Sequence, residues 1–251
     1  MSNYNLAGVQ GLSGARAAEI DAGLRAHMTK VYGTMSVGML ITFAAAWAVS
    51  SLAVDSTGAL TGLGAAIYMS PLKWVIMFAP LAFIFFGFGA AAQRMPAAGV
   101  QVMFYLFSAL MGLSLSSIFL VYTGASIAQV FLVTSITFLS LSLYGYTTKK
   151  DLSGWGTFLI MGVIGILVAM VVNIFIGSGP LAMAISVIGV LLFAGLTAYD
   201  TQNIKNTYIA HAVHGDQEFL GKAAIMGALS LYLDFINMFT MLLNLMGATQ
   251  E

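Results

Sequence analysis

Two aspartates stand inside stretches of sequence that are otherwise apolar enough to cross a membrane. Asp200 lies in the last turns of the apolar run 180–201, and Asp234 lies in the middle of the run 223–246. An ionised aspartate at the centre of a bilayer costs about 2.5–3.5 kcal/mol on insertion scales, so it must face the bundle interior or water. We therefore treat Asp200 and Asp234 as candidate functional residues.

The chemistry open to these two aspartates depends on whether they meet. Two carboxylates about 4 Å apart repel each other by about 4 kcal/mol at an effective dielectric constant of about 20. Such a pair shares one proton and titrates as a unit. It can sense pH, bind a divalent cation when both groups are ionised, or activate water. Because calcium takes about six to eight oxygen ligands, we expect it to bind Asp200 and Asp234 weakly and transiently.

A stripe of polar residues runs along the apolar run 223–246. Its members recur at spacings of four, three and seven residues, which places them on one face of a helix. The stripe predicts that this helix is central and lines an aqueous or substrate pathway. Its members are Ser230, Asp234, Asn237 and Asn244.

Each aspartate also has a less specific interpretation. One alternative makes Asp200 a solvated carboxylate at a helix end, where it escapes most of the cost of burial. The other makes Asp234 a protonated carboxyl group that serves only as an interhelical hydrogen bond. The sequence alone leaves both alternatives open.

The three histidines do not form a metal site by their spacing. His27, His211 and His214 all fall outside the predicted membrane core. The last two share a helical face, but no third ligand is evident and a metal site needs three or four. We expect solvated histidines and no cofactor.

The composition excludes an ordinary water-soluble domain. Of the 251 residues, 60% are hydrophobic and 7% are charged, against roughly 25% charged in a typical soluble protein. The net charge is zero, which excludes the basic surface of a nucleic-acid-binding protein. The chain has no cysteine, so disulfides, thiolate metal sites and a cysteine nucleophile are excluded as well.

Apolar runs divide the chain into seven predicted spans, each close to the length of about 20 residues that crosses a bilayer as a helix. An all-α membrane protein follows, because transmembrane β-strands are about ten residues long with alternating polarity. We expect a cytoplasmic tail over residues 1–30, one seven-helix transmembrane domain over 31–247 and a short tail over 248–251. The predicted spans are Val31–Ala53, Trp74–Ala92, Gly99–Tyr122, Ser126–Tyr146, Trp155–Ile176, Pro180–Thr201 and Ala223–Met246.

The basic residues predict how these spans are oriented. If the N-terminus is cytoplasmic, Lys73 is the one basic residue that falls on the outer side. Seven crossings then place the C-terminus outside. The basic residues on the cytoplasmic side are Arg16, Arg25, Lys30, Arg94, Lys149, Lys150, Lys205 and Lys222.

Three segments give the chain a resemblance to a known family. They are Gly195–Lys205 (GLTAYDTQNIK), Leu231–Phe239 (LYLDFINMF) and Tyr144–Ser153 (YGYTTKKDLS), with a softer match over Gly112–Ile118 (GLSLSSI). The sequence resembles the Bax inhibitor-1 family, also called the transmembrane Bax-inhibitor-motif family, and looks similar to its bacterial inner-membrane members. The resemblance covers residues 30–247.

The resemblance implies a seven-helix bundle with the seventh helix at its centre and a hydrogen-bonded pair of Asp200 and Asp234. It also implies a pH-sensitive calcium leak channel. In such relatives an arginine at the cytoplasmic end of the second span latches onto the aspartate of the sixth span and closes the pore. Counting back without gaps from Gly112 places Arg94 at that position. The alternative for Arg94 is a plain positively charged anchor.

Two further functions compete with the leak channel. One is a non-transporting regulator that binds a membrane protease or a stress complex through its helices, so membrane proteins are possible partners beside lipid and cations. The other is an intramembrane aspartyl protease, because such enzymes also carry Tyr-Asp on span six and an aspartate on span seven. Tyr199-Asp200 fits, but Leu231-Tyr-Leu-Asp234 lacks the glycines of Gly-x-Gly-Asp. We therefore expect no enzyme.

Overall fold

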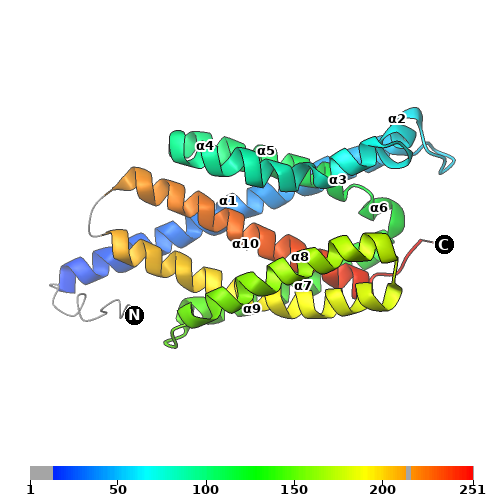
Figure 1. Cartoon of the computed structure of the whole chain (residues 1–251). Coiled ribbons are helices and arrows are strands. Elements are labelled where there is room, and N and C mark those ends of the chain that lie inside the picture. Colours follow the sequence, from blue (N-terminus) through cyan, green and yellow to red (C-terminus); the bar gives the residue numbers. More distant parts are fainter. Residues whose placement is uncertain (1–13, 213–215, 251) are drawn as a thin grey trace.

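The computed structural model describes residues 14–212 and 216–250, and most of these residues are helical. The elements are α1 (Gly14–Ala53), α2 (Gly62–Gly64), η2 (Ala65–Met69), α3 (Leu72–Ala82), η3 (Phe83–Phe88), α4 (Gly89–Arg94), α5 (Ala97–Leu115), α6 (Ile118–Val121), α7 (Gly124–Thr147), η4 (Ser153–Trp155), α8 (Gly156–Ile176), α9 (Gly179–Ala212) and α10 (Gln217–Met246). The long helices form one bundle, in which α9 packs against α10, α7 and α8, and α1 packs against α5 and α10 (Figure 1).

Six helices within the described residues are long and apolar enough to cross a membrane. A further pair, Gly62–Met69 with Leu72–Phe88, is bent by 65° and gives a seventh crossing if it counts as one span. The predicted span Trp74–Ala92 begins after this bend and covers most of α3, η3 and most of α4. The all-α membrane class is confirmed, and seven is the upper value of the span count.

The irregularity of the second span has a local cause. Pro80 lies inside α3, and the helix then widens into the π-helical turns of η3. Proline cannot donate a backbone hydrogen bond and crowds the turn before it, so departures from regular α-helix cluster around it.

The first helix begins well before the first predicted span. Residues 14–30, expected as a cytoplasmic tail, form the first turns of α1. Leu24 and Met28 are each 5% exposed, and Val31 is fully buried. These apolar side chains recur every three or four residues and pack this end of α1 into the bundle. Helix α1 therefore begins before residue 30, and the division into a cytoplasmic tail and a transmembrane domain at that residue stays a prediction.

The last helix is the centre of the bundle. In its membrane-spanning window 67% of α10 is buried, against 11–39% for the other five single helices. It packs against α1, α5, α7 and α9, and it runs through the middle of the view in Figure 1. The predicted central position of the last span is confirmed.

A buried group of hydroxyls joins α10 to two of its neighbours. The hydroxyl oxygens of Tyr232 and Thr42 are 2.6 Å apart, and the Thr42 hydroxyl donates to the carbonyl oxygen of Ser108 at 2.9 Å. Where lipid replaces water, such hydrogen bonds and the close approach of small residues hold helices together. The link orients α10 against α1 and α5.

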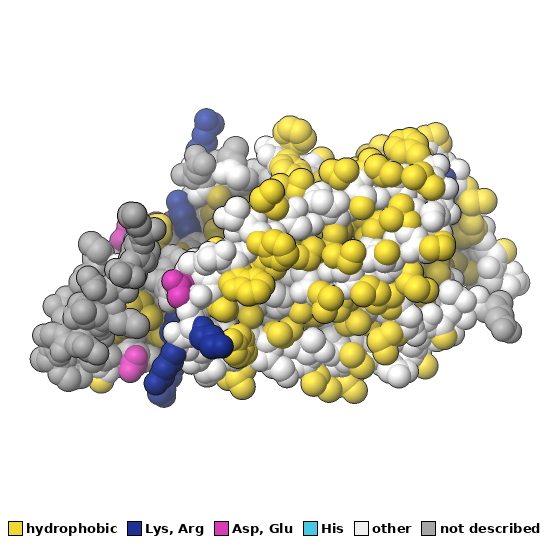
Figure 2. Space-filling model, turned by 60° about the horizontal axis from the view of Figure 1, so that its bottom comes forward, with side chains coloured by type: hydrophobic (Ala, Val, Ile, Leu, Met, Phe, Trp, Pro, Cys, Tyr) yellow, Lys and Arg dark blue, Asp and Glu magenta, His cyan; other side chains and the backbone are white. Residues whose placement is uncertain are grey.

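The surface is that of a protein in lipid. Apolar side chains cover most of the face in Figure 2, while charged side chains gather toward one end. Phe86 and Phe175 are each 85% exposed. Soluble monomers rarely expose continuous apolar surface of this extent, so hydrocarbon chains must cover it.

The residues that follow the C-terminal end of α10 form backbone hydrogen bonds with residues 121–123. The amide of Thr123 donates to the carbonyl oxygen of Ala248 at 3.0 Å, and the amide of Gln250 donates to that of Val121 at 2.9 Å. Residues 248–250 of the predicted tail therefore dock on the turn between α6 and α7. Glu251 lies outside the described residues.

Candidate functional site

Asp234 is a buried acidic residue in the middle of the central helix. Its side chain is 3% exposed, and its Oδ2 atom has no hydrogen-bond partner among the described residues. A buried polar atom without a partner costs about 1–3 kcal/mol. A membrane protein that carries such a group at mid-span usually uses it for function.

Asp200 approaches Asp234 from the neighbouring helix α9. The two carboxyl groups interact electrostatically, and the Ser230 hydroxyl lies within hydrogen-bonding reach of the Asp200 carboxyl. Ser230 and Asp234 are four residues apart on α10, so they share the helix face that meets α9. The structure thus brings together three of the residues that the sequence singled out.

Asp200 also lines a cavity of about 160 Å³ between α1, α9 and α10, which we call the Asp200 cavity. Other polar side chains around it are Asn203, Thr207, Ser230 and His27. A polar space of this size has room for several water molecules. Asp200 therefore reaches a hydrophilic space, whereas Asp234 is not among the residues that line it.

A chain of hydroxyls holds α9 in place next to Asp200. The Thr201 hydroxyl is 2.9 Å from that of Ser142 on α7, which is 2.5 Å from that of Tyr32 on α1. Three helices are thereby joined one residue away from the acidic side chain. Such second-layer contacts fix the direction in which Asp200 points.

The arrangement offers negative charge but few ligands for a bound ion. Within residues 14–212 and 216–250, no group of three or more His, Asp or Glu side chains could hold a metal ion. Two carboxylates supply at most four oxygens, fewer than the roughly six to eight that calcium takes. A cation beside Asp200 would keep part of its water shell.

A family model described as "Inhibitor of apoptosis-promoting Bax1" matches residues 24–251. The chain belongs to the Bax inhibitor-1 family. It is 46% identical to the inner membrane protein YbhL of Escherichia coli K12 over 232 residues, which covers 90% of this chain and 93% of YbhL. It is 42% identical over 260 residues to an uncharacterised protein of Caulobacter vibrioides, with both chains covered fully. The chain is therefore a multi-pass membrane protein of this family.

Two Bax inhibitor-1 motifs that lie far apart in the sequence meet in the structure. The Gln202 side chain accepts a hydrogen bond from the amide of Leu152 at 2.8 Å and donates to the carbonyl oxygen of Lys150 at 2.8 Å. The Lys205 ammonium donates to the carbonyl oxygen of Tyr146 at 2.8 Å. The segment 144–153 is thus fastened to the motif that carries Asp200.

The structure places the remaining predicted site residues away from the carboxyl pair. Arg94 ends α4, is exposed, and forms no ion pair with Asp200 in this conformation of the described chain. Asn237 is half-buried and donates to the carbonyl oxygen of Leu233 on its own helix. Asn244 is exposed while the neighbouring Leu243 is 1% exposed, so Asn244 lies on the outer face of α10. This corrects the expectation of an interior stripe along the whole helix.

One residue near the site was missed by sequence reasoning. His27, expected outside the core, is 7% exposed and lines the Asp200 cavity. It belongs to the buried face of α1 with Leu24, Met28 and Val31. The three-to-four-residue spacing of these positions was the available signal. Of the other histidines, His211 stacks on Phe219 with ring centroids 4.3 Å apart, and His214 lies outside the described residues.

Proposed function

We propose that this Bax inhibitor-1 protein is a pH-sensitive leak channel for calcium or other cations, gated by the pair of Asp200 and Asp234. The observation that carries the proposal is the meeting of two acidic side chains from the last two helices beside a polar cavity. With both groups ionised, the site attracts a cation. When the pair takes up protons, that attraction weakens and the balance between closed and open conformations shifts.

The site suits an ion in transit better than an ion in storage. The two carboxylates leave most of the coordination sphere of calcium to water and backbone carbonyls. Weak coordination allows the ion to leave again, which conduction requires. The role is passive and needs neither catalysis nor a cofactor.

Arg94 enters the proposal as a latch in a second conformation. Its side chain is exposed at the end of α4 and unpaired with Asp200 in this structure. In the closed state we propose that α4 swings the guanidinium onto Asp200. An arginine pairs with a carboxylate more strongly than lysine does, because its planar donors form two parallel hydrogen bonds.

We also propose that the protein lies in a bacterial inner membrane with its N-terminus in the cytoplasm and its C-terminus outside. Most charged side chains in Figure 2 gather toward one end of the molecule, and basic residues favour the cytoplasmic side. The name of the relative YbhL, an inner membrane protein, supports the same membrane.

Reconstitution in liposomes that contain a calcium-sensitive dye tests the proposal. We expect calcium entry that changes with pH. Asp234→Asn and Asp200→Asn should each change the flux by about tenfold or more, the factor that corresponds to the loss of about 1.4 kcal/mol of ion attraction, and should flatten its pH dependence. If both variants keep the flux and the pH dependence of the parent protein, the proposal fails.

A further inference from the structure

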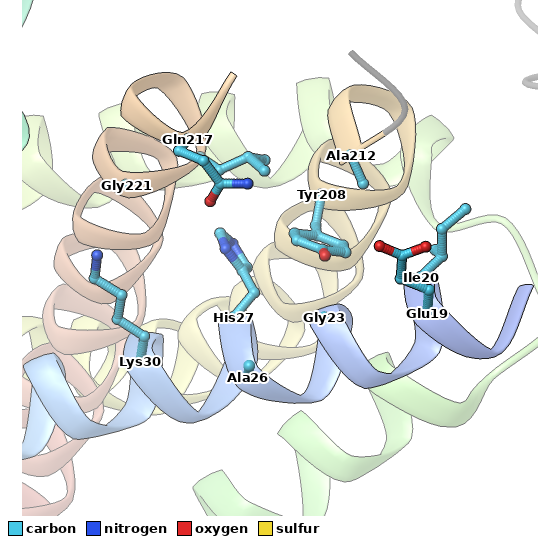
Figure 3. Close-up of a pocket in the computed structure, with 11 residues that line it drawn as sticks. Glu19, Ile20, Gly23, Ala26, His27, Lys30, Tyr208, Ala212, Gln217 and Gly221 are labelled. Carbon is cyan, nitrogen blue, oxygen red and sulfur yellow. The ribbon is translucent and has the colours of Figure 1, made fainter. Parts of the chain in front are cut away.

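A second, larger cavity lies next to the Asp200 cavity. It has a volume of about 570 Å³ and is enclosed by the N-terminal turns of α1, the C-terminal turns of α9 and the first turns of α10. We call it the vestibule. Figure 3 shows the polar side chains around it, which are Glu19, His27, Lys30, Tyr208 and Gln217.

The vestibule and the Asp200 cavity follow each other along the same three helices. On α9, Tyr208 lines the vestibule, and Asp200, nearer the middle of the helix, lines the Asp200 cavity. On α10, Gln217 lines the vestibule and Ser230 lines the Asp200 cavity. His27 on α1 lines both cavities. Its side chain is therefore part of the wall between the vestibule and the Asp200 cavity.

His27 is held at this junction with one ring nitrogen unused. Its side chain is 7% exposed, and its Nε2 atom has no hydrogen-bond partner among the described residues. The ring packs against Tyr208 with centroids 4.9 Å apart, and in Figure 3 it points into the vestibule toward Gln217. A buried imidazole nitrogen without a partner is free to accept a proton from water in the cavity.

Among residues 14–212 and 216–250, the charged side chains that line the two cavities beside His27 are Glu19, Lys30 and Asp200. From α1 come the acidic Glu19 and the basic Lys30, the latter in electrostatic contact with His27. From α9 come Tyr208 in the vestibule and Asp200 across the second cavity.

From α10, Gln217 in the vestibule and Ser230 in the Asp200 cavity are the polar lining side chains, and both are uncharged. Glu19 and Lys30 offset each other in the vestibule. The protonation of His27 therefore decides the net charge that a cation meets on its way to Asp200.

We propose that His27 controls the charge preference of the passage from the vestibule to Asp200. A neutral imidazole offers a lone pair to a hydrated cation, and an imidazolium repels the same cation. Burial, and after it the nearby Lys30, lower the pKa of His27 from its ordinary value. The ring therefore takes up a proton in the acidic part of the histidine range, and acidification on the vestibule side hinders the approach of cations. This inference rests on the proposed cation pathway, and it adds a pH-sensitive group to the two carboxyls.

The chain contains no cysteine, which allows a test that does not depend on transport. Thr207 lines the Asp200 cavity and is half-buried, so Thr207→Cys places a single thiol beyond His27. The full-length variant in lipid nanodiscs is treated with a cationic and an uncharged methanethiosulfonate of similar size. The ratio of the two labelling rates reports charge preference, because the ionisation of the thiol affects both reagents equally.

Protonation of Asp200 would also lower this ratio, so the comparison is made in an Asp200→Asn background. We expect the ratio of cationic to uncharged labelling to fall about threefold or more between about pH 7.5 and about pH 4.5, as a unit charge several ångströms away produces. The range extends to low pH because the pKa of His27 is lowered. The fall should disappear in His27→Gln and persist in Glu19→Gln. His27→Arg, which carries a fixed charge, should give the low ratio at both pH values.

The inference is overturned if His27→Gln keeps the full pH dependence of the ratio, or if the dependence vanishes with Glu19→Gln instead. These results are separable from failure of the proposed function. If the protein carries no calcium in liposomes but the labelling ratio depends on His27, the proposed channel function is wrong and the role of His27 stands. If the protein conducts calcium but the labelling ratio does not depend on His27, the channel function stands and the role of His27 is wrong.

Discussion

The carboxyl group of Asp234, on the central helix α10, meets that of Asp200 on α9 at a place where Asp234 is 3% exposed and its Oδ2 atom has no partner among the described residues. Neither residue alone explains the arrangement. A lone buried aspartate is a cost to stability, whereas two that interact form a unit that can hold a proton or attract a cation.

The first prediction is that the two aspartates act as one unit. The double variant Asp200→Asn with Asp234→Asn should change calcium flux by about as much as either single variant, because the effects of residues that interact electrostatically are not additive. The measurement is dye-reported flux in liposomes over a range of pH. Asp151→Asn is the matched control and should leave flux unchanged. Asp151 is an exposed loop residue whose carboxylate accepts a hydrogen bond from the amide of Ser153. Additive effects of the two single variants would argue for separate roles.

The second prediction concerns the proposed latch. Arg94→Gln should raise calcium flux at neutral pH, because the closed state loses its ion pair with Asp200, and we expect a factor of roughly 10, equivalent to about 1.4 kcal/mol. In an Asp200→Asn background the same change should have little further effect. Lys149→Gln serves as the control, because Lys149 is a basic loop residue on the same predicted side. An equal response to both substitutions would make Arg94 a simple anchor.

The third prediction tests the close packing that positions Asp200. A Cβ atom on Gly145 of α7 would collide with the backbone carbonyl oxygen of Ala198 on α9, two residues before Asp200. Gly145→Ala should therefore lower the free energy of unfolding in detergent by about 1–3 kcal/mol, the usual cost of overpacking. Gly165→Ala on α8 meets nothing within 4 Å and should be neutral or slightly stabilising. Similar stability of both variants would mean that α7 and α9 can separate at no cost.

The fourth prediction uses the loop after α1. Hydrogen bonds from the Thr57 hydroxyl at 2.6 Å and the Thr57 amide at 2.8 Å hold the pKa of Asp55 below its usual range. A lowered pKa in the folded loop means that the ionised form stabilises the loop above the unfolded value of about 3.9, and that this stabilisation is lost as pH falls through the folded pKa.

Limited proteolysis of residues 54–61 measures this effect. Asp55→Ala should make the loop more sensitive to an acid-active protease at about pH 5, and the difference from the parent protein should close at about pH 2, where both lack the ionised carboxylate. Asp55→Asn keeps an oxygen acceptor and is the control, with an intermediate effect at the higher pH. A constant difference at all pH values would assign the effect to side-chain loss rather than to charge.

Much of the architecture could be predicted because it depends on local composition. The transfer of about 20 apolar residues into lipid is favourable wherever they occur in the chain, so most spans follow from run length. The central place of α10 follows from Asp234 and its polar neighbours, which lipid would not tolerate. The early start of α1 was not predicted, because charged residues such as Arg25 and Lys30 share the first turns with the buried Leu24 and Met28. The broken second span was also missed, because hydropathy does not register a departure from α-helical geometry.

The sequence by itself determined that this is an all-α membrane protein, that it carries two acidic side chains within its last two spans, and that its motifs match the Bax inhibitor-1 family. Only the tertiary structure decided that Asp200 comes near enough to Asp234 to interact electrostatically, that His27 lines two cavities, and that Arg94 forms no ion pair with Asp200 within the described chain. The physical reason is that insertion into lipid is a sum over single residues. Contacts between helices depend instead on how each helix is rotated and how closely its neighbours pack, and no single stretch of sequence contains that information.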